Sequence, residues 1–576
     1  MRIRWITLLM IMILVAGCTA TGQEPTPAAS PEATAVPTVT NTPAPTATPA
    51  PTDTPEPTAT PTPAYETLTI RIPQSLSILG ASLEQDTASL NLEGQGLMLE
   101  PTTAEPSDLS LVVQTGAPVE SPGYGFGWRY YAAVVPFDTV NDALLPEELE
   151  TRWSEAQPGP LVVDQATAAL LAAAWGEGQP QVVEMDQLLA TLQADDTAVG
   201  LLPFDALDPT FKVLRIGEAL VLDATLLPEE YPLAFNLGLE GERAQELGPL
   251  VEPLTSGWEN RDTSRLTSLV MTGVTAMCRL TAARMEANGT AYPARVVGAE
   301  LSAADITHVS NEVPFVKGCR VDTSENNLTF CSDYDYWDAL AAIGTDIVGL
   351  SGNHVNDFGY DGARESITFY RDRGIPIYGS GLNETEACAP LFYEHNGNRL
   401  AFIAALAYEP SYAWATESLP GACYYYQNKE ALLEKVAELD ADPEVDMVLV
   451  ELQYEETYVP EPMVNQVIEF RELRAAGADV VTGVQSHVPQ AWEPYGSEDE
   501  GGQGIIVYGL GNFFFDQMWS WETRTGLIAR HTIYEGRLLS SEVLTTVLED
   551  YAQPRWATPA ERAEILERIM LAAPER

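Results

Sequence analysis

Residues 346–359 read DIVGLSGNHVNDFG, and this stretch decides how the larger part of the chain is expected to fold. Residues 346–350 form a short apolar run, which is typical of a buried strand. The residues that follow are small and polar and include Asn353, His354 and Asp357. In layered α/β sheets the functional side chains collect on loops at the carboxyl ends of strands. The stretch therefore predicts a strand that leads into part of a functional site.

The alternation of apolar strands and helical stretches continues on both sides of this motif. Strands are predicted at residues 268–273, 346–350, 400–406, 447–452, 479–483 and 505–510. Helices are predicted at residues 334–343, 362–373, 429–439 and 463–476. Long helices between apolar strands indicate a layered α/β domain. We assign residues 263–549 to this domain and residues 550–576 to a C-terminal helical tail.

Small polar segments recur where several of these strands end. Residues 305–312 are interpreted as one such loop, and they contain Asn311 and Glu312. The later segments carry the side chains of Gln453, Gln485, His487 and Asn512. Carboxylate, amide and imidazole groups are the ligands that divalent cations take in proteins. If these loops converge at one edge of a sheet, the sequence predicts a metal-centred site for phosphoryl chemistry.

These motifs give the chain a family resemblance. Residues 350–359 resemble the Asn-His-x-x-Asp-x-Gly motif of the poly-γ-glutamate capsule-synthesis (CapA) family, whose catalytic-type domain is a variant of the calcineurin-like metallophosphoesterase fold. Asn311-Glu312, residues 478–483 leading to His487, and residues 508–513 are similar to further motifs of that family. The resemblance covers residues 264–517. It implies a role in the synthesis, release or anchoring of a capsule or cell-envelope polymer.

The resemblance also implies roles for individual residues. Glu312, Asn353 and His487 would hold a divalent ion, which would be manganese, zinc, magnesium or iron. His354 would protonate the leaving oxygen, and Asp357 would orient the imidazole. The candidate substrate-binding residues are Asn311, Gln453, Gln485 and Asn512. Glutamine amides bind sugar hydroxyls or peptide groups well and metals poorly.

The sequence departs from the family pattern at the metal. Gly273 is followed by Val274 where the family usually has Gly-Asp, and Gln453 and Gln485 stand where histidines are usual. Two hypotheses remain open. The first is a metal-dependent, phosphoesterase-like hydrolase, and the second is a polymer-binding or assembly protein that kept the fold and lost the metal. The missing ligands favour the second hypothesis as far as chemistry is concerned.

Residues 65–262 show a second, smaller α/β pattern, with a strand at 161–163 and a helix at 166–175. Residues 131–138 and 198–205 are similar to each other, because each is an apolar strand that ends in Pro-Phe-Asp. This region resembles the type II periplasmic solute-binding fold, in which such strand ends face a ligand cleft. The resemblance implies a third hypothesis, that the chain is a small-solute receptor.

The chain begins with the features of an exported lipoprotein. Arg2 and Arg4 precede an apolar run at residues 5–16, which is too short to span a bilayer. The run ends in VAGC, which resembles the lipobox of bacterial lipoproteins and predicts a signal peptide at 1–18 with Cys18 as the lipidated residue. Residues 19–64 are rich in Pro and Thr and predict a disordered stalk. We therefore expect an extracytoplasmic protein that is lipid-anchored to the bacterial cell membrane.

Cysteine content and charge agree with an exported envelope protein. Disulfides are predicted between Cys319 and Cys331 and between Cys388 and Cys423, with Cys278 left over. The formal charge of −53 excludes a nucleic-acid binder, because it repels phosphate backbones. The expected partners are a cell-envelope polymer or the capsule machinery. A polyanionic polymer would require a local basic patch or bridging cations.

Overall fold

The computed structural model describes residues 66–72, 91–92, 97–119, 123–255, 258–324, 326–496 and 503–575. The signal peptide expected at 1–18, with Cys18, and the stalk expected at 19–64 lie outside the described residues. Within the described ranges, no helix combines the length and the apolar character that crossing a bilayer requires. The division of the folded part at residue 262 stays a proposal.

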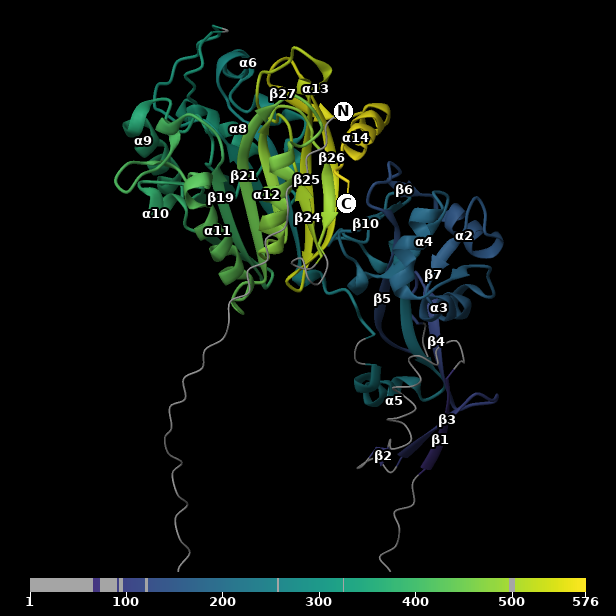
Figure 1. Cartoon of the computed structure of the whole chain (residues 1–576). Coiled ribbons are helices and arrows are strands. Elements are labelled where there is room, and N and C mark those ends of the chain that lie inside the picture. The colour runs from purple at the N-terminus through teal and green to yellow at the C-terminus, as the bar shows by residue number, and fades with distance from the viewer. Residues whose placement is uncertain are drawn as a thin grey trace, which may run out of the picture. The chain divides into compact units, whose positions relative to one another are not determined.

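The region before residue 262 is built on one mixed β-sheet (Figure 1). In the described part of this region, the sheet has ten strands in the order β2-β3-β1-β4-β12-β5-β9-β7-β8, and β10 pairs with β5. The strands are β1 (Glu66–Arg71), β2 (Asn91–Leu92), β3 (Leu97–Thr102), β4 (Leu109–Thr115), β5 (Tyr124–Pro136), β7 (Leu161–Val163), β8 (Gln181–Val182), β9 (Val199–Pro203), β10 (Phe211–Val213) and β12 (Ala234–Glu240), with β6 (Ala143–Leu144) and β11 (Arg215–Ile216) as a separate pair. The helices are α2 (Pro146–Glu155), α3 (Gln165–Trp175), α4 (Leu188–Ala194) and α5 (Ala244–Val251).

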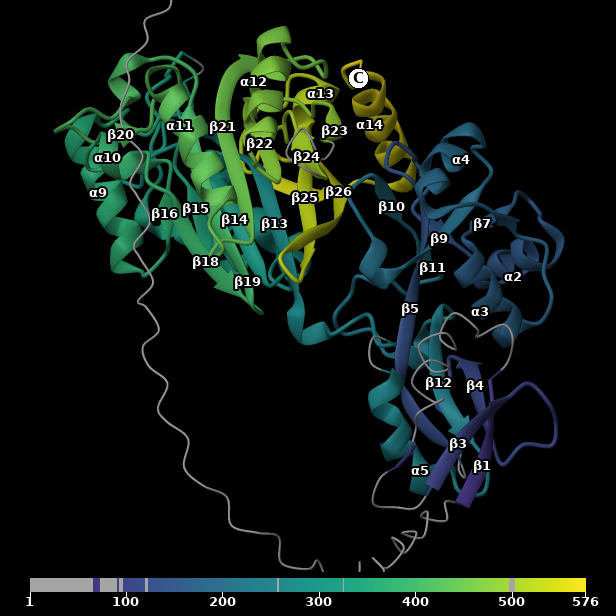
Figure 2. The ribbon, with the colours of Figure 1, turned by 60° about the horizontal axis from the view of Figure 1, so that its bottom comes forward.

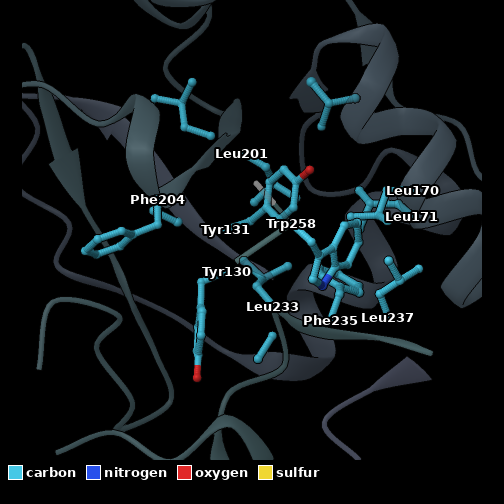
Figure 3. Close-up of a cluster of buried hydrophobic side chains, with 14 of the residues drawn as sticks. Tyr130, Tyr131, Leu170, Leu171, Leu201, Phe204, Leu233, Phe235, Leu237 and Trp258 are labelled. Carbon is cyan, nitrogen blue, oxygen red and sulfur yellow. The ribbon is translucent and has the colours of Figure 1, made fainter. Parts of the chain in front are cut away.

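The core of this region combines aliphatic and aromatic side chains, and Figure 3 shows a cluster of them. The ring of Tyr131 on β5 meets the ring of Phe235 on β12 edge to face, with 5.8 Å between centroids. Trp258 is 2% exposed and donates its indole N–H to the carbonyl of Gly127. Buried aromatic rings in edge-to-face contact add to the stability that apolar burial gives. The sequence prediction of a second α/β region is therefore confirmed.

The two Pro-Phe-Asp segments do not share one edge of this sheet. β5 and β9 are antiparallel, and Tyr131 pairs with Pro203 while Val134 pairs with Gly200. The segment that ends β5 therefore lies at the opposite end of the strand pair from the segment that ends β9. Phe204 is fully buried and packs in the core of this region. The expectation that both segments face one ligand cleft needs correction, because sequence similarity between two strand ends does not reveal strand direction.

The region after residue 262 contains two large sheets. The seven-stranded sheet has the order β16-β15-β14-β13-β25-β26-β27 and the six-stranded sheet has the order β18-β19-β21-β22-β24-β23 in the described residues. The strands of the first are β13 (Leu266–Thr275), β14 (Ile306–Asn311), β15 (Ile347–Gly349), β16 (Ile377–Tyr378), β25 (Thr525–Tyr534), β26 (Arg537–Glu549) and β27 (Gln553–Trp556). Those of the second are β18 (Leu391–His395), β19 (Asn398–Leu406), β21 (Met447–Thr457), β22 (Val480–Ser486), β23 (Trp492–Tyr495) and β24 (Gly504–Val507), and β17 (Ser380–Gly381) pairs with β20 (Gly421–Ala422).

Helices cover the outer faces of both sheets. They are α6 (Arg279–Asn288), α7 (Gly298–Leu301), α8 (Trp337–Ala342), α9 (Gly359–Asp372), α10 (Glu384–Ala387), α11 (Tyr425–Asp440), α12 (Val464–Ala475), α13 (Trp521–Arg524) and α14 (Pro559–Leu571). Helices α11 and α12 lie on β21 and β22, as Figure 2 shows. Between the sheets, side chains such as Met271 and Phe402 form one buried core. The layered α/β prediction is confirmed for this region.

The predicted strands and helices around the motif are confirmed, with two differences. Residues 305–312, for which the sequence predicts a loop, contain β14, and all six residues of this strand are buried. Residues 525–549 form the long antiparallel strands β25 and β26, which the sequence analysis does not predict. The order along the seven-stranded sheet places β13, β14 and β15 side by side and parallel, so their carboxyl ends meet at one edge.

Candidate functional site

The site lies where the parallel strands of the two sheets end. On one side, Thr275 of β13 pairs with Asn311 of β14, so Glu312 follows directly at the sheet edge. On the other, Gln453 of β21 pairs with Val484 of β22. Gly352 joins the loop after β15 to this edge, because a Cβ atom there would lie 2.4 Å from the Cα atom of Glu312. Only glycine permits this approach.

The centre of the site is the side-chain amide of Gln453. Its Nε2 atom donates to Oε2 of Glu312 at 3.2 Å and to Oδ1 of Asn353 at 3.3 Å. It also donates to Oε1 of Gln485. Glu312, Gln453 and Gln485 are each no more than 2% exposed. A buried carboxylate needs hydrogen-bond donors, and the Gln453 amide supplies one.

Gln485 holds a strained backbone conformation at this position. Its φ angle is 89°, in the left-handed region that residues other than glycine rarely adopt. Such a conformation costs about 1–3 kcal/mol and is found where a side chain must be aimed at a functional site. Here the strain presents the Gln485 amide to Gln453, so the contact between the two glutamines is part of how the site is built.

His487 is fixed by Asn512. The Nδ1–H group of His487 donates to Oδ1 of Asn512 at 2.8 Å, which leaves Nε2 as the acceptor of the imidazole. Asn512 Nδ2 donates in turn to the carbonyls of His487 and Thr523 and to Gln517. Burial lowers the pKa of His487, although the charges of Glu312 and Glu456 oppose this. Asn512 therefore positions His487, and the substrate-binding role expected for Asn512 stays a prediction.

His354 and Asp357 form the pair that the sequence predicts. His354 Nδ1 lies 2.7 Å from Oδ2 of Asp357. Asp357 also accepts from the backbone N–H of Phe330 at 2.7 Å and from the hydroxyl of Tyr412 at 3.1 Å. Burial acts to lower the pKa of His354, but the hydrogen bond to Asp357 and the charge of Glu312 outweigh it, so the pKa of His354 is raised. The imidazole is therefore oriented and biased towards its protonated form.

The imidazoles of His354 and His487 both feel the charge of the Glu312 carboxylate. The negative charge of Glu312 acts to raise the pKa of both His354 and His487, an effect that is strong only at short range. A row of rings connects the two histidines: His354 to Phe330 at 4.4 Å, Phe330 to Phe515 at 6.3 Å, and Phe515 to His487 at 5.4 Å between centroids. Glu312 therefore lies near both histidines, and the metal-binding role expected for Glu312 and His487 stays a prediction.

Replacing Asp357 with asparagine is expected to lower the pKa of His354. The amide keeps the size of the side chain but removes the negative charge that favours the imidazolium. Because the folded-state pKa of His354 is raised, its contribution to stability is present below the ordinary histidine pKa and is lost as the pH rises through the folded value. The measurement is an NMR titration of the His354 ring. Asp361→Asn, a fully exposed neighbour, serves as the control, and an unchanged His354 pKa in Asp357→Asn would contradict the assignment.

The donor set does not fit a divalent cation. A metal ion at this edge would need the oxygens of Glu312 and Asn353 to face it, but both already accept the N–H groups of Gln453. Val274 brings only apolar atoms to the end of β13, and it packs in an apolar cluster with Val313 and Phe515. Among the described residues, no three His, Cys, Asp or Glu side chains are arranged to hold a metal ion. The groups at the edge instead form an amide and carboxylate network.

Asn311 stands apart from the network. Its Nδ2 atom donates to the carbonyl of Val313 at 2.7 Å and to the hydroxyl of Tyr370 at 2.9 Å. The side chain thus ties β14 to α9 behind the site. The structure brings together Glu312, Asn353, Gln453 and Gln485 and places His354 and His487 next to them, whereas Asn311 faces the core.

The buried side chain of Glu451 lies two residues before Gln453, on the same face of β21. Glu451 is 1% exposed and accepts from the hydroxyl of Ser310 at 3.2 Å. Burial raises the pKa of Glu451 to about 8. His308 lies 3.6 Å away, accepts from the hydroxyl of Tyr378, and has its pKa lowered by burial to about 3. Both groups are therefore neutral near pH 6, and this contact is a pair of neutral groups rather than an ion pair.

The sequence alone does not reveal this pair. It indicates surface or core-edge positions for His308, His395 and His531, but His308 and His531 are fully buried inside the sheet of β14 and β25. Once β14 is recognised as a strand, its residues point alternately to the two faces, with Thr307 and Val309 on one and His308 and Ser310 on the other. That alternation is the signal that could have placed His308 between the sheets.

Aromatic side chains surround the opening of the site. Tyr458 stacks on His487 with 5.4 Å between centroids and contacts Trp519, which is 64% exposed. Tyr412 donates its hydroxyl to Asp357 on the other side and is 48% exposed. The three phenylalanines beside them, at residues 513–515, are core residues, because none is more than 2% exposed. The exposed rings are therefore those of Tyr412, Tyr458 and Trp519, which we call the aromatic rim.

Both predicted disulfides are present. Cys319 is bonded to Cys331, with 6.1 Å between Cα atoms, and Cys388 is bonded to Cys423, with 4.9 Å between Cα atoms. Cys278 is the free cysteine of the described residues and is buried. Burial raises the pKa of its thiol, so it is a poor nucleophile. Disulfides persist in oxidising compartments, which agrees with an exported protein.

Comparison with known proteins links the region after residue 262 to capsule synthesis. Residues 268–517 match the model of the family described as "Bacterial capsule synthesis protein PGA_cap". The "Capsule biosynthesis protein CapA" of Bacillus anthracis is 26% identical over 301 residues, which cover 51% of this chain and 71% of that protein. The "PGA biosynthesis protein CapA" of Bacillus subtilis is 25% identical over 186 residues, or 32% of this chain and 46% of that protein, so the match spans less than half of that relative. The crystal structure of a 5′-nucleotidase precursor from Thermus thermophilus is 14% identical, covers 53% of this chain and 58% of that chain, and has a TM-score of 0.29.

Proposed function

Residues 268–517 form a domain of the bacterial capsule synthesis (PGA_cap) family, and from this we propose that the chain acts in the synthesis, release or anchoring of a poly-γ-glutamate-like envelope polymer. Within that role we propose polymer binding or assembly rather than metal-dependent hydrolysis. The printed names of the relatives in Bacillus anthracis and Bacillus subtilis, which assign capsule and PGA biosynthesis to them, support the first part.

The hydrogen bonding of Gln453 carries the second part of the proposal. The two N–H groups of the Gln453 amide face three acceptor oxygens, those of Glu312, Asn353 and Gln485, at the place where a metal-dependent site would direct its ligands to an ion. Oε2 of Glu312 and Oδ1 of Asn353, two oxygens that an ion would need, therefore already face a protein donor. His354, whose side chain is 17% exposed, and the exposed aromatic rings beside it are the groups that remain for a polymer to contact.

The aromatic rim supports binding of an extended chain. Tyr458 is 41% exposed and Trp519 is 64% exposed, and their ring centroids are 5.8 Å apart. Large exposed rings beside a polar site supply contact area at a low cost in side-chain entropy. A polymer backbone lying across these rings would pass the opening between His354 and His487. The proposal therefore assigns backbone contact to the rim and polar contact to His354 at the edge of the buried network.

We further propose attachment to the membrane through a lipid on Cys18, with residues 19–64 as a spacer. The proposal rests on the sequence of the first 64 residues. Two acyl chains or more hold a protein firmly on a membrane, whereas one chain does not. In this arrangement the site would work outside the cytoplasm, where a capsule polymer is exported and held.

Polymer binding is tested by titrating the full chain, purified in detergent, with γ-linked polyglutamate of defined length in isothermal calorimetry. Binding is expected to persist in EDTA, and phosphodiester hydrolysis is expected to stay at background with manganese or zinc added. Trp519→Ala together with Tyr458→Ala is expected to weaken binding about tenfold, since each contact is worth roughly 0.5–1.5 kcal/mol. Phe392→Ala, an equally exposed ring on β18 (59% exposed), is the control. Loss of binding in EDTA, or metal-dependent turnover, would refute the proposal.

A further inference from the structure

A cavity of about 650 Å³ lies beside His354, between the start of α6 and the loop that follows β14. Its volume falls in the range of sites that hold small molecules or short polymer segments. Phe330 forms the wall that the cavity shares with the candidate site, because it lines the cavity and packs on the His354 ring at 4.4 Å. A ligand in the cavity would therefore lie next to His354.

The cavity is lined by three cationic side chains. These are Arg279, Lys317 and Arg320. In the described residues, Lys317 and Arg320 are exposed, and their charged groups have no hydrogen bond or ion pair, whereas Arg279 pairs with Asp516. The whole chain has 83 acidic and 30 basic residues, so a carboxylate is available to most cations. Two unpaired cations on one cavity give it a local positive charge, which attracts anions to a protein whose overall negative charge repels them.

Two carboxylates of the described residues near the cavity bond to the loop itself and not to the cations. Asp322 lines it too, but its oxygens accept from the backbone N–H of Ser324 at 2.9 Å and from Asn327 Nδ2 at 3.1 Å. Asp333 accepts from the N–H of Gly318 at 2.6 Å. These hydrogen bonds stabilise the loop between Val316 and Ser332. Asp322 and Asp333 bond to groups of the loop rather than to Lys317 or Arg320, so the ammonium of Lys317 and the guanidinium of Arg320 remain available to a ligand.

The loop that carries the cations is pinned at both ends. The disulfide between Cys319 and Cys331 closes it, and the N–H of Val316 donates to the carbonyl of Ser332 at 2.9 Å. Arg279 stands behind the loop, with its guanidinium 4.9 Å from the centre of the Phe330 ring. A pinned loop loses little conformational entropy when it binds a ligand. The cations are therefore presented by a framework built before any ligand arrives.

We propose that this cavity is an anion-binding subsite in which Lys317 and Arg320 pair with carboxylates of a polyanionic chain. The chain would then continue past Phe330 to His354. This inference rests on the proposed function, because it explains how an acidic polymer can bind to a protein of strongly negative charge. Lys317 and Arg320 supply the local basic patch that a polyanionic ligand requires, so bridging metal cations are not needed.

The test uses the full chain and γ-linked polyglutamate as the probe. Lys317→Glu combined with Arg320→Glu is expected to weaken binding at least about tenfold at low salt and to reduce the salt dependence of the affinity, because two ion pairs become repulsive. The control is Arg364→Glu combined with Lys435→Glu, which makes the same change of charge on α9 and α11. The control is expected to change the affinity less than about twofold. Equal losses of affinity in both double variants would overturn the subsite, because the affinity would then depend on the net charge of the protein alone.

The outcomes separate this inference from the proposed function. If the wild-type chain binds polyglutamate and the Lys317→Glu, Arg320→Glu variant binds it equally well, the subsite is refuted and polymer binding stands. If the wild-type chain binds no polyglutamate at any ionic strength, both fail. An unchanged melting temperature in the variant shows that the exposed substitutions leave the fold intact. A further run with a neutral glycan is expected to show no difference between wild type and variant.

Discussion

Replacing Glu451 with glutamine is expected to raise the free energy of unfolding by about 4 kcal/mol at pH 8 and by less than about 1 kcal/mol at pH 5. Burial raises the pKa of Glu451 to about 8 in the folded chain. In the unfolded chain it titrates near its ordinary value, so between about pH 4.5 and pH 8 the folded state holds one proton more. Stability therefore falls as the pH rises through that window. Glutamine keeps the shape of the side chain and accepts the hydrogen bond from Ser310, but it does not ionise in this pH range.

The measurement is denaturant unfolding of wild type and Glu451→Gln at both pH values. Glu434→Gln, which changes an exposed carboxylate on α11, is the control and is expected to have no pH-dependent effect. A gain that is equal at pH 5 and pH 8 would show that Glu451 titrates normally. A large loss at both would show that the carboxylate is required in its charged form, which contradicts the pairing of neutral groups with His308.

Changing Gln453 and Gln485 together to histidine is expected to create a zinc site and to tighten zinc binding at least about a hundredfold. Imidazole nitrogens replace amide groups that bind metals poorly, and removal of the Gln453 amide frees the oxygen of Glu312. Glu312, Asn353 and His487 then supply the remaining ligands. The experiment is calorimetric titration with zinc and manganese. The control is Gln427→His, which adds an imidazole on the exposed face of α11.

A double variant that binds zinc no better than wild type would show that these donors do not converge on one point. Zinc binding that is equally tight in Gln427→His would show adventitious capture by surface imidazole. The expected result therefore requires both strand-end positions, and it is independent of whether the wild-type chain acts on a polymer.

The elements whose pattern is local could be predicted from the sequence. β13, β15, β19 and β21 are short apolar runs, and each is a strand in the structure. The letters of β14, ITHVSN, are mostly polar and indicate a loop instead. Its His308 and Ser310 side chains point between the two sheets, where His308 meets Glu451 and Tyr378 from distant parts of the chain. No local pattern shows that such distant partners will satisfy them.

The same distinction explains the candidate site. The positions of Glu312, Asn353 and Gln485 could be predicted because each lies near or just past the end of a parallel strand. Gln453 lies inside β21, which runs to Thr457, beyond the strand end predicted at residue 452. The mutual hydrogen bonds of these side chains could not be predicted, because these depend on how the two sheets face each other. The cationic cavity depends on a disulfide loop folding back on α6. The solute-receptor hypothesis for residues 65–262 and the lipid anchor at Cys18 stay predictions.

Metal binding by the wild-type chain tests the central claim most directly, namely that an amide network stands where a metal-dependent relative would hold its ion. The full chain is stripped with EDTA, dialysed against manganese or zinc, and measured for bound metal by mass spectrometry and by calorimetric titration. We expect no saturable binding tighter than about 1 mM at the site, and no change when Glu312 is replaced by alanine. One or two equivalents of tightly bound metal that disappear in Glu312→Ala would contradict the account.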